Sequence, residues 1–200
     1  MKNVLLTGAS KGIGKALAIE FAKRGFNLCL LARDTEKLKS LSNSLKDLNI
    51  KVFFMKCDVT EFEDVQKSIQ FAYEKLGDID IAILNAGVAG SGYFENFDSK
   101  NLKDIYDVNV FGVTHFLELL IPKMKNQNGS IIAAVSSLAD ARGVPGNAAY
   151  CSSKAALTQI LEAARIELKP HGINIVTIRP GFIRTDMTAK NTFYMPFLME

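Results

Sequence analysis

A short apolar run leads directly into a glycine-rich loop in Val4-Leu5-Leu6-Thr7-Gly8-Ala9-Ser10-Lys11-Gly12-Ile13-Gly14. Residues 16–22 then follow with the apolar spacing of a helix. Gly8 can take a tight turn, Gly12 lets the backbone approach a pyrophosphate, and Gly14 lets the helix pack closely on the strand. The free N–H groups at the start of the helix would face the phosphates of a dinucleotide. The stretch therefore predicts a nucleotide-binding strand, loop and helix.

Short apolar runs alternate with helical segments along the rest of the chain. Rich in β-branched residues, the runs indicate buried strands at Val4 to Leu6, Phe26 to Leu31, Val52 to Met55, Ile79 to Leu84, Ile131 to Val135 and Ile173 to Ile178. Alternation of this kind is typical of right-handed βαβ units. It predicts an α/β fold with a doubly wound parallel sheet, a Rossmann fold, and helices on both faces. Without repeats or linkers, residues 1–200 are expected to form a single domain.

Composition and charge argue against several classes of protein. The net charge of +3 comes from 24 basic and 21 acidic residues scattered along the chain, so nucleic acid is not an expected partner. Cys29, Cys57 and Cys151 are far apart, which favours reduced thiols, and neither His115 nor His171 has the neighbours of a metal ligand. No run approaches the ~20 apolar residues of a membrane span. We expect a cytoplasmic protein without a metal site.

The end of the second predicted strand bears on the choice of cofactor. An acidic side chain there would bind the ribose 2′-hydroxyl of NAD and repel a 2′-phosphate. Here Ala32 is followed by Arg33, and its guanidinium, with Lys11 in the glycine loop, would bind the phosphate of NADP. The alternative is that both are solvated surface cations. Asp34 could take the acidic role, although we expect it to cap the next helix. The pattern favours NADP over NAD.

Tyr150 and Lys154 lie four positions apart in an alanine-rich segment that predicts a helix, so their side chains share one face. A tyrosine with a reference pKa near ~10 needs a shift of ~3 units to exchange protons near neutrality. An ammonium group within ~4–6 Å favours the phenolate, so we expect Lys154 to lower the pKa of Tyr150. A tyrosine and a lysine at this spacing occur by chance in many proteins of this composition. The functional meaning of the pair therefore depends on the other motifs around it.

Further polar residues fall at the carboxyl ends of predicted strands, where a doubly wound sheet binds ligands. Ser137 follows the strand ending at Val135 and could bond a substrate carbonyl, with Ser136 as the competing candidate. Asn85-Ala86-Gly87 follows Leu84 and is expected to form the floor of the cofactor site. Asn109 lies in an apolar helical stretch where its amide needs partners, and holding a water molecule is its expected role.

Together these motifs resemble those of the short-chain dehydrogenase/reductase family, and the resemblance runs from Val4 to Met187. Thr7 to Gly14 is similar to its T-G-x-x-x-G-x-G loop, residues 85–87 to its N-A-G, and Tyr150 with Lys154 to its Y-x-x-x-K. The resemblance implies an enzyme that transfers hydride between NADP(H) and a carbonyl or alcohol substrate. It also implies a catalytic tetrad of Asn109, Ser137, Tyr150 and Lys154.

In that tetrad Tyr150 would be the general acid or base, Ser137 would orient the carbonyl, and Asn109 would hold a proton-relaying water. Lys154 would also hold the nicotinamide ribose. The cofactor contacts implied are Gly8, Ser10, Lys11, Gly12, Ile13, Gly14, Arg33, Asp58, Val59, Asn85, Ala86, Gly87, Tyr150, Lys154, Pro180, Gly181, Ile183 and Thr185. Within this set Asp58 would bond the adenine. A homodimer or homotetramer built through the helices carrying Phe111 and Ala155 is also implied.

The C-terminal part looks shortened relative to the family, whose members continue with another strand and further helices. Residues 185–190 predict a short helix, and the apolar tail from Phe193 to Met199 would cover a site, dock on a partner or mark an incomplete end. The substrate pocket would be lined by residues 90–94, 140–147 and 182 onward. The alternative function is a non-catalytic NADP(H)-binding sensor or partner-binding protein with an incomplete pocket. An epimerase or dehydratase would need a different glycine spacing.

Overall fold

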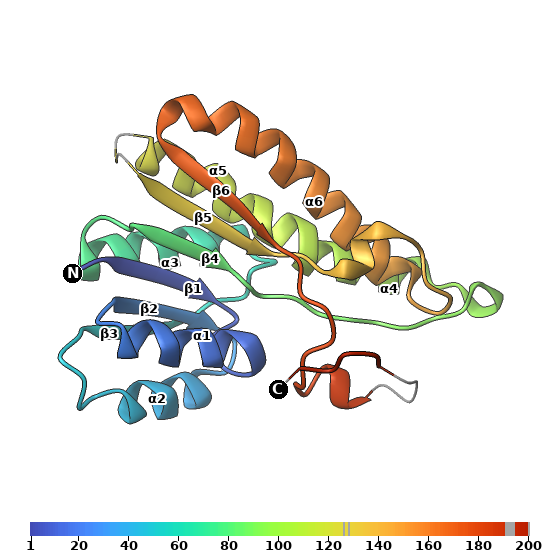
Figure 1. The fold of residues 1–200 in the computed structure, drawn as a ribbon, viewed down its shortest axis with the longest axis horizontal. Coiled ribbons are helices and arrows are strands. Elements are labelled where there is room, and N and C mark those ends of the chain that lie inside the picture. The colour runs from blue at the N-terminus through green and yellow to red at the C-terminus, as the bar shows by residue number, and fades with distance from the viewer. Residues whose placement is uncertain (126, 128, 191–194, 200) are drawn as a thin grey trace.

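The computed structural model describes residues 1–125, 127, 129–190 and 195–199. Its strands form a six-stranded sheet in the order β3-β2-β1-β4-β5-β6 (Figure 1). Every neighbouring pair is parallel. The bounds are β1 Asn3–Thr7, β2 Asn27–Ala32, β3 Val52–Lys56, β4 Ile81–Leu84, β5 Ser130–Val135 and β6 Ile173–Ile178. All six predicted strands are confirmed, and the largest change of bounds is at β4, which begins two residues later than predicted.

Helices connect the strands and cover both faces of the sheet, as predicted. They are α1 Gly12–Lys23, α2 Thr35–Ser44, α3 Phe62–Leu76, α4 Ser99–Tyr106, α5 Gly112–Met124 and α6 Ala148–Leu168. In Figure 1, α1 and α2 lie on one side of the sheet and α3, α5 and α6 on the other. Short helical turns are η1 Phe94–Asn96, η2 Asp107–Phe111, η3 Leu138–Ala141, η4 Lys169–His171 and η5 Thr188–Lys190. No helix in the described part of the chain is long and apolar enough to cross a membrane.

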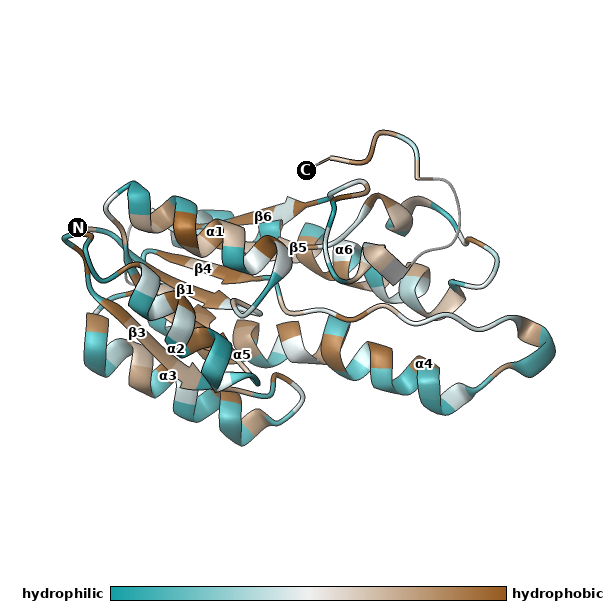
Figure 2. Cartoon of the chain, turned by 90° about the horizontal axis from the view of Figure 1, so that it is seen from below, coloured by the Kyte–Doolittle hydropathy of each residue, from teal (hydrophilic) through white to brown (hydrophobic). Residues whose placement is uncertain are grey.

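Alternate residues of each central strand pack into two separate cores. Val4 and Leu6 of β1 pack with Ala18 of α1, whereas Leu5, between them, packs with Ile69 of α3. Because side chains alternate between the two faces of a strand, a strand covered on both sides must be apolar at every position. Figure 2 shows the resulting layer of hydrophobic strands between helices of mixed polarity.

The edge strand β6 is covered on one face only. Ile173 and Ile175 are buried in the core formed with α3, α5 and α6. On the other face, Val176 remains 42% exposed and Ile178 36% exposed. This opening lies on the side of the sheet that α1 and α2 cover near β1 and β2.

The segment after β6 differs from the predicted helix over residues 185–190. Only Thr188–Lys190 is helical, as the 3₁₀ turn η5. The hydroxyl of Thr188 accepts a hydrogen bond from the Thr185 backbone N–H at 2.9 Å and donates to the Ile183 carbonyl at 2.6 Å. Threonine side chains that bond the nearby backbone compete with helical hydrogen bonds, which explains the shorter helix. Phe193 and Tyr194 of the predicted tail lie outside the described residues, while Met199 pairs with Ile183 in an isolated β-bridge.

Candidate functional site

A cleft of ≈ 360 Å³ opens at the carboxyl edge of the sheet. Loops from the ends of several strands meet there, because parallel strands all end at one edge. Ser137, Tyr150 and Lys154 line this cleft, and so does every predicted cofactor contact except Gly14. Gly14 and Asn109 are not part of the cleft lining. The structure therefore brings residues from position 8 to position 185 into a single site.

The glycines of the first loop are required by close backbone contacts. Gly8 and Gly12 have φ angles of 66° and 53°, in the left-handed region that favours glycine. A β-carbon on Gly14 would lie 2.2 Å from the Gly8 carbonyl oxygen and 2.6 Å from the Asn85 amide nitrogen. Gly14 thus lies behind the loop and does not line the cleft. This agrees with its predicted role in close packing of the helix on the strand and not with a direct cofactor contact.

Asn85 joins the glycine loop to the end of β4. Its side-chain amide donates to the carbonyls of Thr7 at 3.1 Å and Gly8 at 3.2 Å. In return, the hydroxyl of Thr7 accepts hydrogen bonds from the backbone N–H groups of Asn85 at 2.9 Å and Ala86 at 3.0 Å. Hydrogen bonds therefore connect residues 85–87, the predicted floor of the cofactor site, to the glycine loop predicted to bind the phosphates.

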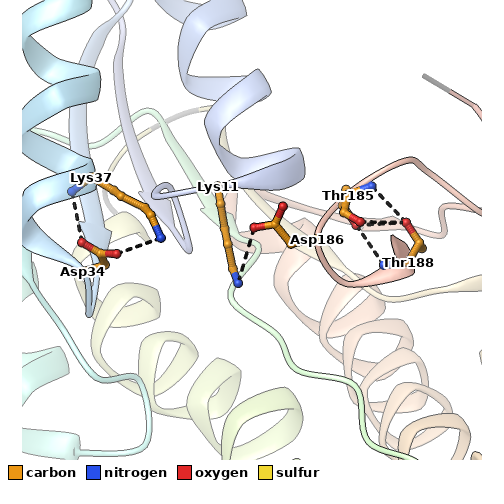
Figure 3. Close-up of polar contacts among 6 residues, drawn as sticks. All are labelled: Lys11, Asp34, Lys37, Thr185, Asp186 and Thr188. Atoms are coloured by element: carbon orange, nitrogen blue, oxygen red, sulfur yellow. Dashed lines mark hydrogen bonds and ion pairs between the residues drawn. The ribbon is translucent and has the colours of Figure 1, made fainter. Parts of the chain in front are cut away.

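Each cation at the β2 end of the cleft has a carboxylate partner. Arg33 lies 3.8 Å from Asp58, and Lys11 lies 3.9 Å from Asp186 across the cleft. Figure 3 shows Lys11 and Asp186 pointing toward one another, with Thr185 and Thr188 on the adjoining turn. Both cations and Asp186 are largely exposed and Asp58 is partly exposed, so each pair contributes little to stability and a stronger anion can replace the carboxylate.

Asp34 caps α2, as predicted. Its carboxylate accepts a hydrogen bond from the Lys37 backbone N–H at 3.1 Å, and Lys37 Nζ lies 3.0 Å from the same carboxylate (Figure 3). Both interactions lower the pKa of Asp34, the backbone hydrogen bond most. Lys37 itself lines the cleft and is a third cation that the sequence analysis missed. The sequence could have indicated this cation, because Lys37 lies in the first helical turn after the capping residue Asp34, close to the end of β2.

Lys154 is a buried ammonium group on the wall of the cleft. The side chain is on α6, its residue is 4% exposed, and Nζ donates to the Val135 carbonyl oxygen at 2.8 Å. Burial lowers the pKa of Lys154 to about 8. Nζ lies 5.9 Å from the centre of the Tyr150 ring, which confirms that the two residues share one face of a helix.

The expected lowering of the Tyr150 pKa is wrong for this structure. Burial raises the pKa of Tyr150 above its usual value, and a hydrogen bond with Ser137 lowers it by less. The physical reason is that desolvation of the phenolate outweighs the neighbouring groups. Ser137, rather than Lys154, is the neighbour that stabilises the phenolate here.

Ser136 and Ser137 have different partners, which separates the two candidates. Ser136 is 2% exposed, and its hydroxyl contacts the Lys154 carbonyl at 3.1 Å and the Thr158 hydroxyl at 2.7 Å. The Ser137 oxygen accepts a hydrogen bond from the Ala139 backbone N–H at 3.1 Å. That acceptance leaves the Ser137 proton available for a donor role in the cleft.

Asn109 is fully buried in η2, a π-helical segment between α4 and α5. Its amide oxygen accepts from the Val88 backbone N–H at 2.8 Å, and its nitrogen donates to the Val88 carbonyl at 2.9 Å and to Ser153 at 3.0 Å. The amide therefore has the partners that the sequence analysis required. Both of its N–H groups are used, and the side chain ties the segment after Gly87 to α6.

Comparison with known proteins agrees with this geometry. The family model described as short chain dehydrogenase matches residues 2–193. The chain belongs to the short-chain dehydrogenase family. An uncharacterized oxidoreductase of Myxococcus xanthus is 34% identical over 199 residues, which cover 100% of this chain and 79% of that protein.

Two solved structures of related short-chain dehydrogenases carry nicotinamide dinucleotides. The 3-ketoacyl-(acyl-carrier-protein) reductase from Brucella melitensis, complexed with NADH, has a TM-score of 0.89 and 28% identity over 96% of this chain and 80% of its own. An alcohol dehydrogenase from Thermococcus sibiricus, complexed with 5-hydroxy-NADP, has a TM-score of 0.86 and 29% identity over 92% and 77%. The fold of this short-chain dehydrogenase is therefore one that binds a nicotinamide dinucleotide, in either the phosphorylated or the unphosphorylated form.

Within the described part of this short-chain dehydrogenase, the remaining titratable groups do not gather into a metal centre. Among the described residues, no three or more histidine, cysteine, aspartate or glutamate side chains are placed to hold a metal ion. Cys29 and Cys57 are buried, and burial raises their pKa values to about 12 and about 11. Both thiols are therefore protonated and inert at neutral pH.

Proposed function

We propose that this short-chain dehydrogenase transfers hydride between NADP(H) and a carbonyl or alcohol substrate. The observation that carries the proposal is the wall formed by Ser137, Tyr150 and Lys154, which lines the same cleft as the glycine loop. The cofactor would supply or accept the hydride at its nicotinamide ring. The residues of the chain would then bind the dinucleotide, orient the carbonyl and move the proton.

In the reducing direction, Tyr150 donates its hydroxyl proton to the carbonyl oxygen as the carbonyl carbon receives the hydride. The raised pKa of Tyr150 keeps the phenol protonated, which suits an acid. Ser137 donates a second hydrogen bond to the same oxygen. In the oxidising direction, the phenolate would be the base, and Ser137 helps to form it by lowering the pKa of Tyr150.

Lys154 would hold the nicotinamide ribose and place positive charge beside Tyr150. One ammonium proton is given to the Val135 carbonyl, which leaves two for other acceptors in the cleft. Asn109 would hold a water molecule that relays protons. Since both amide N–H groups are donated to protein acceptors, the water would bond to another group of this residue, such as its main-chain carbonyl.

The preference for NADP rests on the cations around the ribose end of the cleft. Lys11, Arg33 and Lys37 all line it, and the three cationic side chains are each more than half exposed. A 2′-phosphate carries a charge of about −1.5 to −2 and would compete well with their carboxylate partners. We also propose one domain over residues 1–200 and a homodimer or homotetramer. The exposed ring of Phe111, at 50%, supports the assembly.

Turnover and binding must be measured separately to test the proposal. Purified protein should consume NADPH with one or more members of a panel of aldehydes and ketones. Tyr150→Phe should abolish that turnover while NADPH still binds by calorimetry. Equal turnover by both proteins would contradict the role of Tyr150. NADPH binding without turnover across the panel would favour the non-catalytic alternative.

A further inference from the structure

Asp140 is a buried carboxylate that lies beside the cleft without lining it. It belongs to η3, three residues after Ser137, and its side chain is 2% exposed. From the sequence, Asp140 was expected to begin a pocket-lining segment, residues 140–147. In the structure its side chain points into the protein, toward α6 and the end of β6, and Asp140 is absent from the cleft lining.

Two charged or polar groups from distant parts of the chain converge on this carboxylate. The Thr158 hydroxyl of α6 donates to Oδ2 at 2.7 Å, and the Arg179 guanidinium donates to Oδ1 in a short ion pair. Arg179 follows β6 directly and precedes Pro180 of the cleft. One carboxylate therefore connects η3, α6 and the exit of β6.

The network continues from Thr158 to the backbone at Lys154. Thr158 donates its single proton to Asp140, so the single Ser136 proton is shared between the Thr158 hydroxyl oxygen at 2.7 Å and the Lys154 carbonyl oxygen. Ser136 also lies 3.1 Å from the Lys154 carbonyl, one helical turn before Thr158. This orientation of the protons requires an acceptor at Asp140, which an ionised carboxylate provides at both oxygens.

The charge of Asp140 is retained despite its burial. Burial by itself would raise the pKa of Asp140, but the hydrogen bonds from Arg179 and Thr158, the charge of Arg179 and a hydrogen bond with Ser136 together outweigh it, and the net shift is downward. An asparagine at this position would present an N–H group to one of two donors. It would thus leave either Arg179 or Thr158 without its acceptor.

Ser137 is the residue whose position depends most directly on Asp140. The Asp140 backbone N–H donates to the Ser137 carbonyl at 3.1 Å, and Ala139 N–H donates to the Ser137 hydroxyl oxygen at 3.1 Å. Leu138 N–H donates to the Pro180 carbonyl at 3.0 Å. The turn that carries Ser137 is thereby fastened at its far end through the Asp140 side chain.

We infer that Asp140 is a positioning residue for the reaction, which holds Ser137 in register with Tyr150 and Lys154 through Thr158 and Arg179. This inference rests on the proposed function. It assigns no contact between Asp140 and substrate or cofactor. Its effect should appear in the orientation of the Ser137 hydroxyl, and so in both turnover and the ionisation of Tyr150.

Asp140→Asn is the direct test, because it keeps the shape of the side chain and removes its charge. We expect kcat to fall roughly 10- to 100-fold, as for other small misplacements of a catalytic group, while KM and the Kd for NADPH change less than threefold. The pKa of Tyr150 should rise, since Ser137 is the group that lowers it. That pKa is measured by ultraviolet difference titration against the same protein carrying Tyr150→Phe.

Two further variants make the test decisive. Asp104→Asn removes an exposed carboxylate of α4 and should leave kcat and the Tyr150 titration unchanged. Thr158→Val keeps the pair between Asp140 and Arg179 but removes the link to α6, so it should give a smaller change in the same direction. It replaces Asp140→Asn if that variant fails to fold.

The outcomes separate this inference from the proposed function. A folded Asp140→Asn protein with wild-type kcat and an unshifted Tyr150 titration would overturn the positioning role. A matching loss of NADPH affinity would overturn it too, since it would indicate a general structural role. If wild-type protein shows no turnover with NADPH, the proposed function fails. The Tyr150 titration then still tests whether Asp140 positions Ser137.

Discussion

The ammonium nitrogen of Lys154 lies 2.8 Å from the carbonyl oxygen of Val135, so the lysine of α6 is bonded to the last residue of β5. The residue is 4% exposed. A buried ammonium with one backbone acceptor is poorly compensated for lost hydration, which accounts for its pKa of about 8. Lys154 is therefore costly to the fold, and such a cost is expected where a residue serves a functional site.

Lys154→Met should change the pH dependence of stability in a defined window. The folded-state pKa of about 8 lies below the ordinary 10.5, so the unfolded chain binds more protons between these values. The unfolding free energy of the wild type should then rise relative to Lys154→Met by about 1.4 kcal/mol per pH unit from pH 8 to 10.5, about 3 kcal/mol in total. Denaturant unfolding at several pH values measures the difference, and parallel curves would contradict the assignment.

Ser137→Ala should raise the pKa of Tyr150 and slow carbonyl reduction by about 100-fold, because the carbonyl oxygen loses one of two donors. Difference titration and steady-state kinetics measure the two effects. Ser152→Ala is the matched control, since its hydroxyl bonds the Ala149 carbonyl within α6 at 3.2 Å. Equal effects from both substitutions would show that the loss is not specific to the Ser137 hydroxyl.

Gly14→Ala should prevent the loop after β1 from closing on α1. The added carbon would lie 2.2 Å from the Gly8 carbonyl, so the backbone must shift, and a destabilisation of about 3 kcal/mol or more is expected. Gly143→Ala is the control, because nothing lies within 4 Å of its added carbon. Thermal unfolding should show a clear loss for Gly14→Ala and a change near zero for Gly143→Ala. A stable Gly14→Ala protein would refute the close packing.

Arg33→Ala should weaken NADPH binding by about 10- to 100-fold and NADH binding far less, since a charge-assisted hydrogen bond is worth about 1.5–3 kcal/mol. Asp186→Asn should strengthen NADPH binding about two- to fivefold by freeing Lys11 from an exposed ion pair. Lys23→Gln, in the last turn of α1, should change neither. Calorimetry with both cofactors measures the ratio, and an unchanged ratio in Arg33→Ala would contradict NADP selection by this residue.

Local features of the sequence were sufficient for most of the fold. Each strand coincides with an apolar run in the sequence, and the central strands are covered on both faces. Gly8, Gly12 and Gly14 lie where the backbone geometry or a close contact disfavours a side chain. Tyr150 and Lys154 share a helix face because of a four-residue spacing. The helix predicted at residues 185–190 failed because Thr185 and Thr188 bond the backbone instead.

Relations between distant residues required the tertiary structure. Asn109 meets Ser153 across 44 positions, and Asp140 meets Arg179 across 39, so no local pattern could predict either pair. The pKa of Tyr150 also depended on its surroundings in the fold, because desolvation outweighed the hydrogen bond with Ser137. The sequence thus determined which chemical groups are present and on which elements they lie. Packing alone decided which of them touch and how far each is removed from water, since both depend on how separate elements meet in space.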